Sequence, residues 1–233
     1  MSTSHVLSPD DSPFLDDPSR YRQTVGALQY ATLPRPDYAF AVNKVCQFMH
    51  APTENHWAGV KRILRFLKGA LNLGLWIRHN TGYQLQAFSN SDWVGCPFDR
   101  RSTGGHAIYL GSNLISWCAR KQRTVSRSST KSEYKAIADS VAELIWLKSL
   151  LRELGLDSLA PTLWCDNLGA TYLTANPVFH ARTKHVEVDY HFVREQVTQG
   201  KLYVKFISTD DQIADIFTNP LSSQKFEFLR SKL

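Results

Sequence analysis

The chain has 233 residues, of which 43% are hydrophobic and 21% charged, and this ordinary globular composition excludes wholesale disorder. Lys and Arg outnumber Asp and Glu by 27 to 21, and the net charge of +6 suits an anionic partner without identifying one. No apolar run approaches the ~20 residues of a membrane span, and the first residues lack the order of a signal peptide, so we expect no membrane partner. The 4 cysteines are widely spaced, which argues against a zinc site and fits a reducing compartment, so we expect a location in the cytoplasm or the nucleus.

The first third of the chain predicts a tail and a small helical unit. Residues 1–16 are rich in Ser, Asp and Pro and are typical of a loose tail. Residues 17–80 carry apolar residues at spacings of three and four, and prolines divide them into three short helices. The polar link at 79–82 ends this segment, so we expect a second, larger domain over 81–233.

The larger domain alternates between β-like and helical patterns. Strands are expected at 85–88, 106–110, 114–118, 162–165 and 202–207. Helices are expected at 132–154, at 168–174, up to residue 192 and at 212–217. Three strands, a long helix and then alternating strands and helices are typical of an α/β layer architecture.

Acidic residues fall at the ends of these expected elements. They are Asp92 after the first strand, Glu133 in the first turn of the long helix, Asp166 after the fourth strand and Asp215 in the last helix. Brought together, four acids can hold two divalent cations that clamp the attacking and leaving oxygens of a phosphodiester. Each acid also has a plain structural explanation. Thr130-x-x-Glu133 matches a helix capping box, Asp166 can cap the next helix, and the other two can be surface acids.

Ten short strings, in order along the chain, carry a resemblance to a known family. They are YRQTVGALQY at 21–30, RPD at 35–37, RILRFLKG at 62–69, SDWVGC at 91–96, RRSTG at 100–104, ISW at 115–117, SSTKSEY at 128–134, CDN at 165–167, TKH at 183–185 and QIADIFTNPL at 212–221. With these strings the chain resembles the ribonuclease H domain of copia-type LTR-retrotransposon Pol polyproteins. The resemblance covers nearly the whole chain, and residues 17–80 correspond in it to the C-terminal end of the reverse transcriptase.

The resemblance implies a fold, a site and a substrate. The fold is ribonuclease H-like, with a five-stranded mixed sheet whose first three strands are antiparallel, flanked by helices. The site binds two Mg²⁺ or Mn²⁺ ions, and Glu133, Asp166 and Asp215 match three of its metal-binding acids. The partner is an RNA–DNA hybrid, whose RNA strand is cleaved endonucleolytically. His185 matches a histidine of the family's site in chain order only, and a structural role is its competing explanation.

The first acid of the site departs from the family pattern. The family has S-D-x-D-W, whereas this chain has Ser89-Asn90-Ser91-Asp92-Trp93, so the neutral amide of Asn90 stands at the catalytic aspartate. Asp92 lies on the same side of a strand but about 6.6 Å further along, too far to replace it without a bulge. We therefore expect an incomplete two-metal site and an impaired ribonuclease H. The alternative is a catalytically inactive, nucleic-acid-binding remnant of a decayed or domesticated element.

A basic stretch precedes the long helix. Between residues 100 and 131 there is no acid, and the basic residues are Arg100, Arg101, Arg120, Lys121, Arg123, Arg127 and Lys131. A phosphate backbone along this stretch gains affinity through counterion release, and Ser128, Ser129 and Thr130 can add sugar and phosphate contacts. The alternative is a solvated basic face.

The resemblance also predicts what the chain lacks. It begins downstream of the family's polymerase palm and has no YVDD-like pair, so we expect that it does not polymerise. The upstream reverse transcriptase of the parent polyprotein is then a missing partner, and in an intact element the location is a cytoplasmic virus-like particle.

Overall fold

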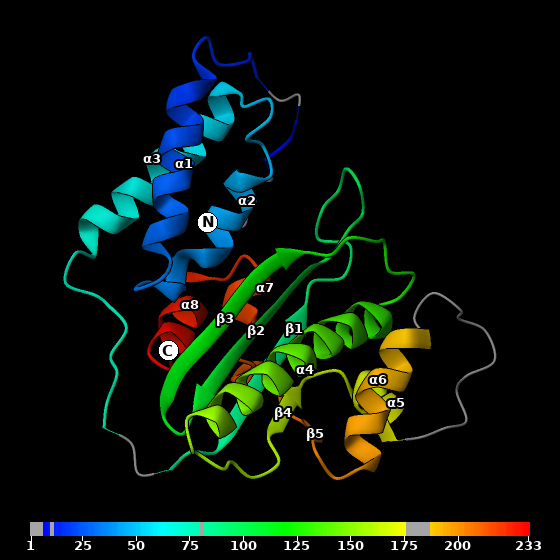
Figure 1. Ribbon diagram of the computed structural model, residues 1–233. Coiled ribbons are helices and arrows are strands. Elements are labelled where there is room, and N and C mark those ends of the chain that lie inside the picture. The colour runs from blue at the N-terminus through cyan, green and yellow to red at the C-terminus, as the bar shows by residue number, and fades with distance from the viewer. Residues whose placement is uncertain (1–6, 10–11, 80–81, 176–186) are drawn as a thin grey trace. The chain divides into compact units, whose positions relative to one another are not determined.

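The computed structural model describes residues 7–9, 12–79, 82–175 and 187–233, in two compact units (Figure 1). One unit contains residues up to Trp76 together with Asn219–Leu233, and the other runs from Ile77 to Thr218. The sequence predicts that 219–233 belong to the larger domain, whereas the structure groups them with the N-terminal helices. In the parts of the chain that the structure describes, no helix combines the length and apolarity needed to cross a membrane.

The first unit is helical, as the apolar spacing predicts. Its helices are α1 (Pro18–Ala31), α2 (Ala39–Cys46), α3 (Glu54–Gly69) and α8 (Ser223–Arg230), with a 3₁₀ turn at Pro36–Tyr38. Asp17 caps α1 by accepting a hydrogen bond from the Ser19 N–H at 2.9 Å. Tyr21, Val25 and Val60 are fully buried between the helices and give this unit its own small core.

The second unit is built on one mixed sheet. Its strands are β1 (Leu85–Ser91), β2 (Thr103–Leu110), β3 (Asn113–Lys121), β4 (Thr162–Cys165) and β5 (Tyr203–Phe206), in the order β3-β2-β1-β4-β5. β1, β2 and β3 are antiparallel neighbours, while β4 pairs in parallel with both β1 and β5. This is the sheet that the ribonuclease H resemblance implies, so the predicted fold class is confirmed.

Helices cover the sheet and complete its core (Figure 1). They are α4 (Ser129–Glu153), α5 (Leu168–Ala175), α6 (Glu187–Thr198) and the single turn α7 (Asp215–Thr218), with a 3₁₀ turn at Thr209–Asp211. The buried stripe of α4, including Ile137 and Val141, packs with Leu85 and Leu163 of the sheet. β1 is longer than its apolar run predicts, because Asn90 and Ser91 continue the ladder opposite β2.

Two adjacent glycines of β2 show which helix covers which face. A Cβ on Gly104 would lie 3.7 Å from the Ala136 side chain of α4, whereas a Cβ on Gly105 would lie 2.8 Å from the Phe217 side chain of α7. Successive strand residues point to opposite faces, so α4 and α7 lie on opposite sides of the sheet. Asn90 pairs with Gly105 and shares the α7 side, while Ser91 pairs with Gly104 and shares the α4 side.

We predict that Gly105→Ala destabilises the second unit by roughly 1–3 kcal/mol, since a methyl group there overlaps α7 and the Cys118 carbonyl. Gly104→Ala is the matched control, because its methyl group meets only ordinary contacts at 3.5 Å or more. Chemical denaturation of both variants measures the difference. Equal stability of the two would contradict the close packing of α7 on β2.

Candidate active site

The predicted site residues meet at one edge of the sheet. Asn90 lies near the end of β1, and Asp166 directly follows β4. These strands are parallel neighbours, so their carboxyl ends reach the same edge. The N-terminal part of α4 brings Glu133, its fifth residue, to this edge from one face, and α7 brings Asp215 from the other.

The side chain of Asn90 is hydrogen-bonded to Asp215. Its Nδ2 donates to Asp215 Oδ1 and to Thr218 Oγ1, both at 2.6 Å. Asn90 is 3% and Asp215 4% exposed, so water screens this contact poorly. A carboxylate at position 90 has no proton to donate here and would face Asp215 as a like charge.

Glu133 is a buried carboxylate on the other side of β1. Its Oε1 accepts a hydrogen bond from the Ser91 N–H at 3.2 Å. Burial raises the pKa of Glu133 well above its ordinary value of 4.5, and the charges of Asp166 and Asp215 raise that pKa further. A nearby cation would stabilise the ionised form of Glu133, because its positive charge opposes the effects of burial and of the neighbouring acids on the pKa.

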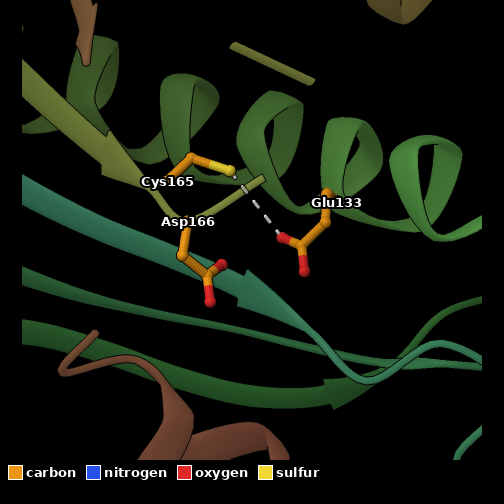
Figure 2. Close-up of side chains that lie close together, drawn as sticks. All are labelled: Glu133, Cys165 and Asp166. Carbon is orange, nitrogen blue, oxygen red and sulfur yellow. Dashed lines mark hydrogen bonds between the residues drawn. The ribbon is translucent and has the colours of Figure 1, made fainter. Parts of the chain in front are cut away.

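Asp166 and Glu133 point toward the same space, with Cys165 beside them (Figure 2). One ligand atom of each of these three residues lies within 4.8 Å of the other two. The buried Cys165 Sγ lies 3.9 Å from Glu133 Oε2, and burial, followed by the charge of Glu133, raises the pKa of this thiol. The sequence analysis missed Cys165. Strand alternation could have found it, because Cys165 shares with Leu163 the face of β4 that packs on α4.

The structure overturns the plain explanations for two acids. The N-cap of α4 is Ser128, whose side chain accepts from the Lys131 N–H, so Thr130 and Glu133 form no capping box. Asn167, not Asp166, caps α5 by accepting from the Ala170 N–H at 2.9 Å. The carboxylate of Asp166 instead accepts from Thr209 Oγ1 at 3.0 Å. Neither acid is explained as a helix cap.

The carboxylate of Asp92 is held by the start of β2. β1 ends at Ser91, and the Asp92 carboxylate accepts a hydrogen bond from the Thr103 N–H at the start of β2. The Asp92 N–H in turn donates to the Thr103 carbonyl at 3.0 Å. The charge of Asp92 raises the pKa of Glu133 less than the charges of Asp166 and Asp215 do.

The predicted substrate-binding residues are spread over two loops, β3 and the start of α4. Arg100, Arg101, Arg123 and Arg127 are exposed in the loops that follow β1 and β3, and Ser129 is exposed in the first turn of α4. The Trp93 Nε1–H, which donates to the Ser126 carbonyl at 3.0 Å, joins these loops. Lys121 instead pairs with Asp99 at 2.8 Å, and Arg120 lies near the acids of α4, where its charge lowers the pKa of Asp139 against the larger effect of burial. Their role in binding stays a prediction, and His185 lies outside the described residues.

Relatives with known names cover the full chain. It is 47% identical over 234 residues to the retrovirus-related Pol polyprotein from transposon RE2 of Arabidopsis thaliana, and 48% identical to that from transposon RE1 of the same plant. Both alignments cover 100% of this chain. The chain is therefore homologous over its whole length to one segment of the Pol polyproteins of copia-type retrotransposons. It spans 16% of the length of these curated relatives. No family model matches it.

A solved retroviral structure supports the fold of this Pol segment. The foamy viral protease-reverse transcriptase in complex with RNA/DNA hybrid matches 87% of this chain and 26% of its own, with a TM-score of 0.55 and 12% identity. At this identity the similarity shows a shared fold. The sheet order is the one that the ribonuclease H resemblance implies, and the similarity to retrotransposon Pol polyproteins agrees with it.

The raised pKa of Glu133 predicts a pH dependence of stability in metal-free protein. The unfolded chain releases this proton near pH 4.5 and the folded chain only at higher pH, so the free energy of unfolding falls as pH rises through that window. Glu133→Gln has no proton to release. We expect it to match the unmodified chain in acid and to be more stable at neutral pH, measured by thermal unfolding with a chelator. Glu153→Gln, at the exposed end of α4, is the control without this gain. A pH profile unchanged by Glu133→Gln would contradict the burial of this charge.

The Asn90–Asp215 contact predicts a metal-dependent stability. In metal-free protein, Asn90→Asp removes a buried donor and adds a like charge, which we expect to lower stability by roughly 1–3 kcal/mol. Mn²⁺ should restore most of this loss, as measured by melting temperature with and without the ion. Asn90→Ala, which loses the donor but adds no charge, should gain less from Mn²⁺. An Asn90→Asp protein that is stable in chelator and indifferent to Mn²⁺ would contradict the arrangement.

Proposed function

We propose that the second unit binds RNA–DNA hybrid and cleaves its RNA strand weakly, as an impaired ribonuclease H. The observation that carries the proposal is the meeting of Glu133, Asp166 and Asp215 with Asn90 at one sheet edge in a copia-type Pol chain. Acids drawn from α4, β4 and α7 converge there although they lie far apart in sequence.

The donor set fits a divalent ion. Glu133 and Asp166 offer hard carboxylate oxygens within 4.8 Å of each other, which suits Mg²⁺ or Mn²⁺, and Asp215, which accepts a hydrogen bond from Asn90, supplies a third acid. When bound there, such ions supply the positive charge that stabilises the phosphoryl oxygens during hydrolysis. Asn90 adds a neutral amide whose N–H groups face Asp215, so the set is one anion short of four acids.

Other residues of the chain would hold the hybrid and orient the acids. The exposed Arg100, Arg123 and Arg127 lie in the two loops that the Trp93–Ser126 hydrogen bond joins, and they would hold the phosphate backbone of a hybrid. Ser91 N–H orients the Glu133 carboxylate, and Thr209 orients that of Asp166. The amide of Asn90 keeps Asp215 in place without an ion, at the expense of the charge that a second cation needs.

The test is hybrid cleavage by the unmodified chain and by Asn90→Asp. We predict cleavage barely above background for the first and an increase of at least ~100-fold for the second, the scale of one preorganised charge-stabilising group. Within the Asn90→Asp protein, alanine at Glu133, Asp166 or Asp215 should abolish the gain. Asp92→Ala, whose carboxylate is held by Thr103, should matter far less. Brisk cleavage by the unmodified chain that is lost on Asp92→Ala would show that Asp92 has taken over the missing position.

A second candidate function is hybrid binding without cleavage, as a remnant of a decayed or domesticated element. The Asn90–Asp215 hydrogen bond favours it, because it satisfies Asp215 in the absence of a metal. Salt-sensitive hybrid binding without cleavage in either protein would select this alternative. We also propose that the chain acts as part of a larger Pol polyprotein, and its cytoplasmic or nuclear location stays a prediction.

A further inference from the structure

Two buried glutamines lie beside the acidic residues without being part of them. Gln122 directly follows β3 and is 8% exposed, and Gln212 precedes α7 and is fully buried. A glutamine side chain carries both a donor and an acceptor, so one amide can join two segments of the chain. Each of these glutamines does so across the site.

Gln212 joins β1 to the segment that carries Asp215. Its Nε2 donates to the Ser89 carbonyl at 3.0 Å, and its Oε1 accepts from the Ala214 N–H at 3.2 Å. Ser89 immediately precedes Asn90, and Ala214 immediately precedes Asp215. The α7 helix is a single turn, so its own hydrogen bonds hold it weakly and this side chain fixes its place against the strand.

Gln122 joins the same strand to the segment that carries Glu133. Its Nε2 donates to Ser91 Oγ at 3.2 Å and to the Ser132 carbonyl at 2.9 Å. Ser91 immediately follows Asn90 and binds Glu133 through its N–H, and Ser132 immediately precedes Glu133. The glutamine thus ties the first turn of α4 to β1 at the point where the carboxylate enters the site.

We infer that Gln122 and Gln212 are positioning residues that clamp the two acid-bearing helices onto β1 on either side of Asn90. They set the distance between the Glu133 and Asp215 carboxylates, and hence the affinity for a divalent ion. The inference rests on the proposed function. Because all of these groups are buried, a lost hydrogen bond leaves an unpaired polar group, and the helix shifts to relieve it.

The side chains of Gln122 and Gln212 differ in their further hydrogen bonds. Gln122 Oε1 also accepts from Ser126 Oγ at 3.3 Å, and the Ser126 carbonyl receives the Trp93 indole N–H. Ser126 lies between Arg123 and Arg127, two of the predicted hybrid-binding residues. The Gln122 side chain therefore acts on both the acidic edge and the basic loop, whereas the side-chain hydrogen bonds of Gln212 join β1 to the residue before Asp215.

The test uses Gln122→Met and Gln212→Met in the Asn90→Asp protein, since Met has a similar shape and lacks the amide. Mn²⁺ affinity is measured by calorimetry, and we expect it to fall by about tenfold or more in each variant, as for other residues that orient metal ligands. Val141→Ala, a cavity in the core face of α4, is the control for lost stability alone and should leave Mn²⁺ affinity nearly unchanged.

Two further measurements separate positioning from mere folding. Hybrid affinity should fall in Gln122→Met and stay unchanged in Gln212→Met, while the cleavage rate at saturating hybrid should fall in both. Where a Met variant does not fold, the Asn variant replaces it. Gln212→Asn keeps a neutral amide on a side chain one methylene shorter, which cannot reach both the Ser89 carbonyl and the Ala214 N–H, so it should bind Mn²⁺ more weakly.

The outcomes keep the two proposals apart. If Asn90→Asp binds Mn²⁺ and cleaves hybrid, and the glutamine variants change Mn²⁺ affinity no more than Val141→Ala does, the clamp is refuted and the proposed function stands. If Asn90→Asp binds Mn²⁺ but does not cleave, the proposed activity is refuted, and Mn²⁺ affinity still decides the clamp. If Asn90→Asp does not bind Mn²⁺, both proposals fall together.

Discussion

The parallel pairing of β1 with β4 is the constraint on which the site depends. It aligns the ends of two strands from distant parts of the chain, so that Asn90 and Asp166 reach the same edge of the sheet. β1 also lies between α4 and α7, which cover opposite faces and deliver Glu133 and Asp215 to its end. Any shift of β1 by one residue would exchange the faces of Asn90 and Ser91 and separate the acids.

A neutral amide changes the electrostatics of this edge. In a site of four acids, cations offset the mutual repulsion of the carboxylates, and the arrangement depends on them. Here Asn90 donates to Asp215 and Thr218 and removes one of the repulsive charges. Glu133 stays buried near Asp166, and burial, followed by the charge of Asp166, raises its pKa. Stability without a metal therefore favours Asn at position 90, whereas catalysis favours Asp.

The helix-start acids show how a local pattern can mislead. Thr130-x-x-Glu133 has the spacing of a capping box, yet Ser128 caps α4 and Glu133 turns to the Ser91 N–H. Asp166 has the position of an N-cap, yet Asn167 takes that role. In both places a neighbouring side chain accepts the hydrogen bond from the backbone N–H at the helix start. The carboxylate of the acid can therefore take part in the site at the sheet edge. The glutamines at 122 and 212 gave no local pattern at all, because their partners lie up to 123 residues away.

The sequence by itself determined the fold class, the family resemblance and the acids that the resemblance carries over, because periodicity and ordered motifs are local properties of the chain. It also determined that Asn90 stands where an aspartate is expected. Only the tertiary structure decided which groups touch. Four features join residues that sequence spacing does not relate. They are the Asn90–Asp215 hydrogen bond, the contact of Cys165 with Glu133, the hydrogen bond from Thr103 to Asp92, and the grouping of 219–233 with the N-terminal helices. Such contacts depend on strand register and on the faces that helices cover, and these are fixed only when the whole sheet has formed.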